Sequence, residues 1–355
     1  MKKFLVIACL LVVVLMVILL RTDNTALSKE DTSYYVVYSS MLRRSSSIVG
    51  IDDSGVPTFI KRLTLQDISK CDYVNGVCIA GGSRANNHFI IDKNGEVEEF
   101  YLLDNPNYSG VTTITMDESN IYAVMNGNLT DNTYQNLLVI QTADGNTIEK
   151  RIIDIYARDI LFNENILYIV GGYLNVEQDV WSCKIIRYDL QTGIFTERTD
   201  TPGKQYMSCQ IYEGNLLCTV ADMQGDIFQI DILDCVTMQK NKDITFLNPV
   251  YNIAANDDVI LIVFENSISI LDLQKNKLFA KVSLPDGTYV TQAVLTPNHL
   301  YLLSRNNEKK YSEKSVHLGY ISNLNLETFS LISTPLITSE EYHDSIIFFP
   351  MHQTQ

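Results

Sequence analysis

The chain has 355 residues, of which 42 are acidic and 27 are basic, so its formal net charge at pH 7 is −15. A chain this acidic lacks the positive footprint of a nucleic-acid-binding protein and is poorly suited to peripheral binding of anionic lipid. It is long enough to bury a large apolar core. We therefore expect no nucleic acid among its partners.

The N-terminal segment differs from the rest of the chain. Lys2 and Lys3 precede seventeen consecutive apolar residues at positions 4–20. As a helix this run would be about 26 Å long, close to the hydrocarbon thickness of a bilayer. The two lysines favour a cytoplasmic N-terminus. We therefore predict a single transmembrane signal-anchor at residues 1–21 and a polar tether at residues 22–31.

Two other fates of this segment stay open. A cleaved signal peptide would leave a secreted domain, but its apolar region is usually shorter, and Arg21-Thr22-Asp23-Asn24 lacks a small-x-small cleavage site. A lipoprotein is the second alternative, because Val6-Ile7-Ala8-Cys9 resembles a bacterial lipobox, although most of the apolar run follows the cysteine. With the anchor retained, we expect everything after residue 31 to lie outside the cytoplasm.

After residue 31 the sequence is a succession of short runs rich in residues that favour strands. No long apolar pattern at helical spacing occurs in this part of the chain. An apolar strand recurs in seven places, and these strands begin at Val36, Val77, Ile121, Leu167, Leu217, Ile260 and Leu300. Short polar turns such as Asn75-Gly76 precede six of them, and such residues form tight hairpin turns.

A second column of residues repeats in phase with the first. Each member follows a β-rich stretch and precedes a turn that contains Gly, Asn or Thr; the members are Asp52, Asp92, Thr142, Asp189, Asp234, Asp272 and Asn325. The steps between them are 38 to 53 residues, and a period near 45 with β-type units is typical of a propeller. We therefore predict an all-β, seven-bladed β-propeller over residues 32–350, with six or eight blades as the alternatives.

The two ends of the predicted ring complement each other. The first unit begins at Tyr34 without the preceding strand that the other units have. The C-terminal run Ser345–Phe349 is apolar and lies beyond the seventh unit. Because an unpaired apolar edge invites association, we predict that this run supplies the missing strand and closes the ring.

The fourth unit carries a family resemblance. From Leu167 it reads LYIVGGYLNVEQDVWSCKIIRYDLQTGIFTERTDTP, with the pairs Gly171-Gly172 and Tyr188-Asp189. This stretch resembles a kelch repeat, although that family usually has Trp where this chain has Phe195. The second unit keeps a double glycine at Gly81-Gly82, and the other units are nearer to quinoprotein-like or YVTN-like propellers. The resemblance implies a propeller scaffold, and we expect the double glycines to allow sharp turns.

Six cysteines follow the predicted membrane segment. Cys71 and Cys78 flank one hairpin turn, and Cys209 and Cys218 flank the corresponding turn three units later. An exported domain permits disulfides, so cross-strand pairing is one interpretation. The alternative is that these cysteines are small core hydrophobes.

The sequence contains no motif for a catalytic, metal or cofactor site: HExxH, CxxC, GxSxG, GxGxxG and the P-loop are all absent. We therefore predict no catalytic residue, no metal and no cofactor. The expected function is that of a membrane-tethered, extracytoplasmic, non-catalytic binding or scaffolding module for a protein or glycan partner. The alternative is a propeller enzyme, such as a hydrolase, lactonase or oxidoreductase, with converging polar groups at its central channel.

Recognition by a rigid β-scaffold usually lies in its variable loops. The longest insertions are Asn126–Asn136, Gly172–Val180 and Arg305–Ser315. The last of these contains Lys309, Lys310 and Lys314 in an otherwise acidic chain. We predict these three lysines as a contact for an acidic partner, with a solvated loop as the alternative.

Overall fold

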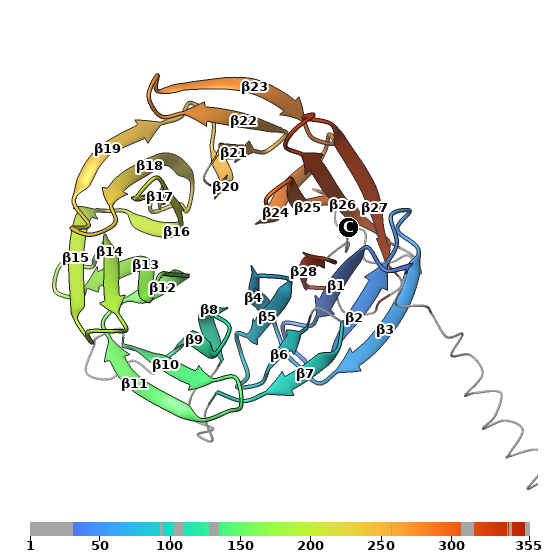
Figure 1. Cartoon of the computed structure of the whole chain (residues 1–355), viewed down its shortest axis with the longest axis horizontal. Helices are drawn as coiled ribbons and strands as arrows, with labels where there is room; N and C mark the ends of the chain where they lie inside the picture. The colour runs from blue at the N-terminus through green and yellow to red at the C-terminus, as the bar shows by residue number, and fades with distance from the viewer. Residues whose placement is uncertain are drawn as a thin grey trace, which may run out of the picture.

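The computed structural model describes residues 31–92, 95–102, 110–127, 135–256, 258–306, 316–338, 340 and 343–351. They form seven four-stranded antiparallel sheets, which stand as blades around a central axis (Figure 1). The predicted all-β, seven-bladed propeller is therefore confirmed. The predicted membrane segment lies outside the described residues, as does the tether up to residue 30. Within the described part, no helix is long and apolar enough to cross a membrane.

Each blade is a sheet of four strands, ordered from the axis outward. Blade 1 contains β28 (Ser345–Pro350), β1 (Tyr34–Ser39), β2 (Ser46–Ile51) and β3 (Pro57–Leu63). Blade 2 contains β4 (Ile68–Val74), β5 (Val77–Gly82), β6 (His88–Ile91) and β7 (Val97–Phe100). Blade 3 contains β8 (Val111–Met116), β9 (Asn120–Met125), β10 (Asn136–Thr142) and β11 (Thr147–Ile153).

The remaining blades follow the same order. Blade 4 contains β12 (Tyr156–Asn163), β13 (Ile166–Asn175), β14 (Val180–Asp189) and β15 (Phe195–Pro202). Blade 5 contains β16 (Gln205–Tyr212), β17 (Asn215–Ala221), β18 (Ile227–Asp234) and β19 (Lys240–Thr245). Blade 6 contains β20 (Val250–Ala255), β21 (Ile260–Phe264), β22 (Ser267–Asp272) and β23 (Lys277–Ser283). Blade 7 contains β24 (Thr288–Leu295), β25 (His299–Asn306), β26 (Val316–Asn325) and β27 (Leu331–Thr338).

The C-terminal run is the innermost strand of blade 1, the position predicted for it. β28 pairs antiparallel with β1 along its whole length. It is also bonded to both neighbouring blades. The Phe348 N–H donates to Gln292 Oε1 of blade 7 at 2.8 Å, and the Ser345 hydroxyl donates to Asp67 Oδ1 beside blade 2 at 2.8 Å. The two ends of the chain are thus joined in one sheet.

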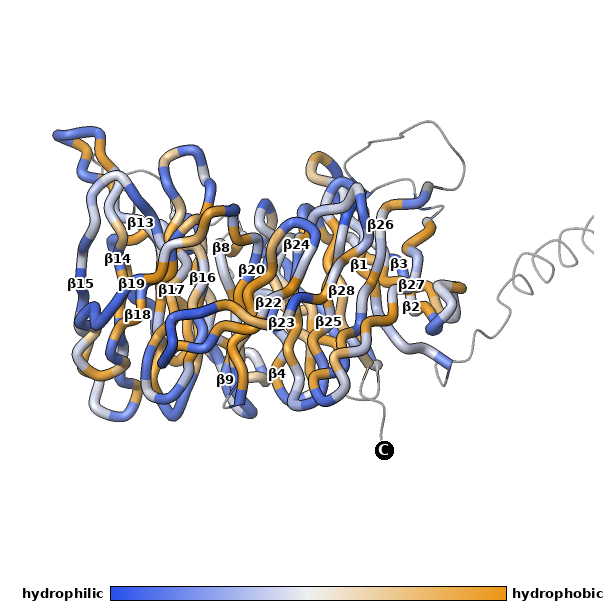
Figure 2. Tube along the Cα trace, turned by 90° about the horizontal axis from the view of Figure 1, so that it is seen from above, coloured by the Kyte–Doolittle hydropathy of each residue, from blue (hydrophilic) through white to orange (hydrophobic). Residues whose placement is uncertain are grey.

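The apolar core lies between adjacent blades. Successive side chains of a strand point to opposite faces, so β28 serves two clusters at once. Phe348 is buried with residues of blade 7, whereas Phe349 is buried against Phe89 of blade 2, with ring centroids 6.5 Å apart. Figure 2 shows the ring edge-on, with apolar segments along the strands and polar segments at the turns.

The repeated column of residues found in the sequence marks the turns between the third and fourth strands. Asp189 Oδ1 accepts the backbone N–H groups of Gln191 and Thr192, and Asn325 Oδ1 accepts those of Glu327 and Thr328. Such bonds satisfy backbone groups that a tight turn leaves unpaired. The repeat therefore has an architectural role.

The double glycines do not form turns, which corrects the sequence expectation. Gly171 and Gly172 lie inside β13, where they pair with Ala157 and Tyr156 of the inner strand. A Cβ at Gly171 would overlap the carbonyl oxygen of Tyr156. Glycine is needed there because the inner strand approaches too closely for a side chain.

Candidate functional site

A cavity of about 710 Å³ lies in the central channel. It is lined by the inner strands of blades 2 to 7 and opens where these strands turn into the second strands. We call this side of the ring the turn face. The opposite side, with the connections between second and third strands and between blades, is the loop face. The cavity therefore belongs to the ring as a whole rather than to one blade.

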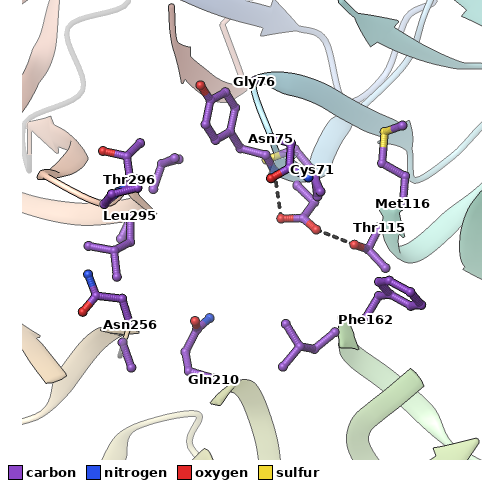
Figure 3. Close-up of a pocket in the computed structure, with 18 of the residues that line it drawn as sticks. Cys71, Asn75, Gly76, Thr115, Met116, Phe162, Gln210, Asn256, Leu295 and Thr296 are labelled. Atoms are coloured by element: carbon purple, nitrogen blue, oxygen red, sulfur yellow. Dashed lines mark hydrogen bonds between the residues drawn. The ribbon is translucent and has the colours of Figure 1, made fainter. Parts of the chain in front are cut away.

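The cavity wall combines apolar side chains with a few amides and hydroxyls. Phe162, Gln210, Asn256 and Leu295 stand around one open space, each contributed by a different blade (Figure 3). Volumes of about 300–1,000 Å³ and mostly apolar walls with a few placed polar groups are typical of ligand sites. The arrangement suits a ligand that has apolar parts and hydrogen-bonding groups.

A ring of β-bulges shapes the inner strands near the loop face. In blades 2 to 7 the pairing of the inner strand with its neighbour skips one residue: Ser69, Thr112, Arg158, Met207, Tyr251 and Thr291. A bulge re-aims the side chains that follow it. The next residue of every one of these strands is polar or charged: Lys70, Thr113, Asp159, Ser208, Asn252 and Gln292. The backbone thus repeats around the channel, whereas the chemistry differs from blade to blade.

Two carboxyl groups in the channel have raised pKa values. Asp72 accepts hydrogen bonds from the Thr115 hydroxyl at 2.5 Å (Figure 3) and from the Tyr73 N–H at 2.8 Å, yet burial still raises its pKa. Asp159 accepts the Cys209 N–H at 2.9 Å. Burial raises the pKa of Asp159 to about 6, with a smaller contribution from the charge of Asp72.

Two cationic side chains lie in the same part of the channel. Burial lowers the pKa of Lys70, and the charge of Asp159 opposes this change. The Arg158 guanidinium lies 4.4 Å from the ring centroid of Tyr156 and donates from Nη2 to Gln205 Oε1 at 3.3 Å. Among the described residues, the buried Nε of Arg158 has no hydrogen-bond partner. Charges of both signs therefore converge near the axis.

The structure describes only some of the residues that the sequence predicts for recognition. Lys309, Lys310 and Lys314 lie outside the described residues, so their role stays a prediction. The three long insertions all connect second and third strands, which places their ends on the loop face. Only Gly172–Val180 is described throughout, and it extends the β13–β14 hairpin. The cavity opens on the opposite side of the ring from the insertion Gly172–Val180 and from the described ends of the other two.

Sequence reasoning missed the residues of the channel. Lys70 of blade 2 and Asp159 of blade 4 stand at equivalent places, directly after the bulge of the inner strand, and Asp72 lies two residues after Lys70 in the same strand. Charged residues inside otherwise apolar first strands were a signal that could have identified them. The part of the chain that the structure describes contains no group of three or more His, Cys, Asp or Glu side chains suited to hold a metal ion.

The chain matches no protein-family model and no curated protein. Its structure is similar to solved propellers. A streptogramin B lyase has 13% identity and a TM-score of 0.56, with 89% of this chain and 91% of that chain covered. A functionally unknown protein from Desulfotomaculum acetoxidans has 11% identity and a TM-score of 0.57, with 88% and 98% covered. The WD40 domain of Neurospora crassa Pan2 has 10% identity and a TM-score of 0.52, with 77% and 80% covered.

These likenesses establish the propeller fold alone. Identities of 10 to 13% carry no function, because one fold hosts many unrelated activities. They also do not distinguish kelch-like from quinoprotein-like repeats.

Proposed function

We propose that this protein is an extracytoplasmic binding module, anchored in a membrane through residues 4–20, whose channel cavity accepts a segment of a protein partner. The observation that carries this proposal is the cavity of about 710 Å³ at the turn face. It is built by six blades at once, so only an intact ring presents it. A rigid scaffold of this kind holds its binding groups in place before the ligand arrives, which lowers the entropic cost of association.

The wall of the cavity supports the choice of a peptide segment. The side-chain amide of Gln210 can donate to and accept from the backbone of an extended chain. Asn256 can donate to it from Nδ2, while its Oδ1 accepts the N–H groups of Asp258 and Val259. Phe162 and Leu295 offer apolar contacts to its side chains. Amides and aromatic rings can also bind a glycan, and the experiment below distinguishes a glycan from a peptide.

The insertion that contains three lysines offers a second contact within the same proposal. Lys309, Lys310 and Lys314 form a basic group in an acidic chain and would attract an acidic partner, mainly by raising the association rate. The membrane anchor would confine both surfaces to partners at the same membrane, whereas signal cleavage would release the module as a secreted protein.

A propeller enzyme is the second candidate, and the carboxyl groups of the channel favour it. Asp72 and Asp159 have raised pKa values, and a carboxyl group whose pKa is raised toward neutral pH can serve in acid–base catalysis. One of the similar structures is a streptogramin B lyase, which adds an analogy of fold to this observation.

Site-specific photo-crosslinking in native membranes tests the binding proposal. A photoreactive amino acid replaces Gln210 in the cavity wall or, as a control, Leu247, which is 99% exposed and lies outside the cavity. We expect a defined protein adduct from position 210 that position 247 does not give. Ala255→Trp, which fills part of the cavity, should remove this adduct. Because Ala255 also packs against the apolar cluster between blades 5 and 6, the circular dichroism spectrum of the variant checks that the ring is still folded.

Three outcomes would contradict the proposal. An adduct at position 210 that persists in Ala255→Trp would place binding elsewhere. A glycan in the adduct would replace the peptide ligand. Turnover of a small substrate that Asp72→Asn abolishes, with no adduct at position 210, would favour the enzyme.

A further inference from the structure

Two buried cysteines of blade 5 face each other across neighbouring strands. Cys209 of β16 is directly opposite Cys218 of β17. Both side chains are fully buried in the apolar cluster between blades 4 and 5. All six cysteines from Cys71 to Cys235 are free thiols in the structure, so a covalent bond between these two would be a new feature of the molecule.

The hydrogen bonding shows which kind of pair this is. The Cys209 N–H donates to Asp159 Oδ2 of blade 4, so it points toward the channel and away from β17. The preceding N–H, of Ser208, points toward β17 and donates to Thr219 Oγ1 at 3.0 Å. Cys209 and Cys218 therefore occupy a non-hydrogen-bonded position of the antiparallel ladder.

This position is the one that suits a cross-strand disulfide. Directly opposite residues at non-hydrogen-bonded sites have Cα atoms about 4.5 Å apart, with their side chains closest. A disulfide needs a Cα separation of about 4.4–6.8 Å. The pairing of β16 with β17 thus places the two residues where a disulfide can join them without a change of register.

The other pair of cysteines in the sequence does not share this geometry. Cys71 is opposite Ala80, and Cys78 is opposite Tyr73. The two cysteines are therefore diagonal neighbours, offset by two positions, and such neighbours are about 7–8 Å apart. Cys71 also accepts a hydrogen bond from Gln292 at 3.3 Å. Each pair flanks a hairpin turn in the sequence, but only Cys209 and Cys218 are directly opposite each other in the strand pairing.

We propose that Cys209 and Cys218 form a disulfide when the chain folds in an oxidising environment. The oxidant is a disulfide-bearing compound, such as oxidised glutathione or a thiol oxidase. The two thiols lose two protons and two electrons as the new S–S bond forms, and the S–S bond of the oxidant breaks to give two thiols. Formation in cells rests on the proposed extracytoplasmic location, whereas formation in vitro rests on the strand pairing alone.

The burial of the two thiols determines when the disulfide can form. Burial raises the pKa of both thiols above its ordinary value, and the thiolate is the attacking species in disulfide exchange. The bond therefore forms during folding and not in the closed native sheet. Once formed, it fixes β16, the strand that contributes Gln210 to the cavity wall.

Oxidative refolding of the full chain in detergent tests the proposal. The unfolded, reduced protein is refolded with oxidised and reduced glutathione, free thiols are alkylated, and the chain is cleaved after glutamate. Glu213 lies between the two cysteines, so the two fragments stay joined only through the disulfide. We expect a linked fragment pair that has lost two hydrogens and that separates on reduction.

Matched variants exclude a fortuitous pairing. Cys209→Ser and Cys218→Ser should each abolish the linked pair and leave the other cysteine open to alkylation, whereas Cys71→Ser should leave the linked pair intact. The same linkage in protein from native membranes, absent from protein made in a reducing cytoplasm, would support the proposed location. Complete alkylation of both residues after oxidative refolding, or pairing of either with Cys183 or Cys235, would overturn the proposal.

Discussion

The aspartates of the outer turns and those of the channel differ in the direction of their pKa shifts. A hydrogen bond from the Ser54 hydroxyl lowers the pKa of Asp52, and the Thr192 N–H lowers that of Asp189. In the channel, burial raises the pKa of Asp72 and Asp159. The ionised form is stabilised at the turns and destabilised around the axis.

This difference separates two tasks of the molecule. A turn aspartate organises a hairpin and contributes to the stability of its blade. A buried carboxyl in the channel costs stability, because its charged form has lost hydration. Asp72 and Asp159 offset part of this cost, because they accept hydrogen bonds from Thr115 and the Cys209 N–H of the neighbouring blades. Carboxyl groups with perturbed pKa values in a cleft are nevertheless typical of functional sites. The outer turns therefore stabilise single blades, whereas the inner strands join neighbouring blades and line the cavity of the proposed function.

The inner and outer strands should differ most in their tolerance of lost apolar volume. Phe349→Ala removes a fully buried ring from β28, and we expect it to lower the free energy of unfolding by about 3–5 kcal/mol. Phe279→Ala on the outer strand β23, where the ring is 51% exposed, should cost much less. Denaturant unfolding of both variants measures the difference. Equal losses would mean that β28 does not hold the ring together.

The second strands should also resist added volume where the inner strand lies close to them. Gly171→Ala introduces a Cβ that overlaps the Tyr156 carbonyl, and we expect a loss of about 1–3 kcal/mol in unfolding free energy. Gly145→Asn is the control, because this turn glycine has a φ of +94° and open space around it, and asparagine tolerates positive φ. It should stay within about 0.5 kcal/mol of the wild type. A harmless Gly171→Ala would contradict the close approach of the two strands.

Asp159 should make the stability of the protein depend on pH. The pKa of Asp159 is about 6 in the folded chain against an ordinary value of 3.8. Between these values the folded chain holds a proton that the unfolded chain has lost. Stability should therefore fall as pH rises from about 4 to 6, with a slope of at most about 1.4 kcal/mol per pH unit for this group. Asp159→Asn should remove this component in urea titrations at several pH values.

The turn aspartates should show the opposite sign. Because the pKa of Asp52 is lowered in the folded chain, its contribution is present above the ordinary value of 3.8 and is lost as pH falls through the folded pKa. Asp52→Asn should therefore leave the fall in stability between pH 4 and 6 unchanged. A loss of that fall in Asp52→Asn, rather than in Asp159→Asn, would reverse the assignment.

A single turn should make a small contribution. Asn325→Ala removes the acceptor for the backbone N–H groups of Glu327 and Thr328, and we expect a loss of about 1 kcal/mol. Asn325→Asp keeps the acceptor and should restore the stability. Thermal unfolding of the two variants checks this. An alanine variant as stable as the wild type would show that the repeated residue is dispensable at this turn.

The turns and the closing strand could be predicted from the sequence because their causes are local or can be counted. Asp52 and Asp189 bond backbone groups within four residues of themselves, so the pattern is visible in a short window. The closing role of Ser345–Phe349 follows from one missing strand at the start of the ring and one extra strand at its end.

The channel could not be predicted in this way because its neighbours are distant in the chain. Asp159 meets the Cys209 N–H fifty positions away, and the bulges that direct the polar column arise from register between strands. The double glycine was misread for the same reason, since the chain that crowds Gly171 belongs to another strand. The fold and the turns are thus encoded by short stretches of sequence, whereas the candidate site depends on contacts between distant strands.

The most direct test of this division of tasks measures partner capture and melting temperature together for Ala255→Trp and Asn325→Ala. We predict that Ala255→Trp, in the cavity wall, abolishes the adduct at position 210 in a chain that is still folded. We predict that Asn325→Ala, at an outer turn, lowers the melting temperature and keeps the adduct. Capture that survives in Ala255→Trp, or that disappears in a folded Asn325→Ala, would contradict the division.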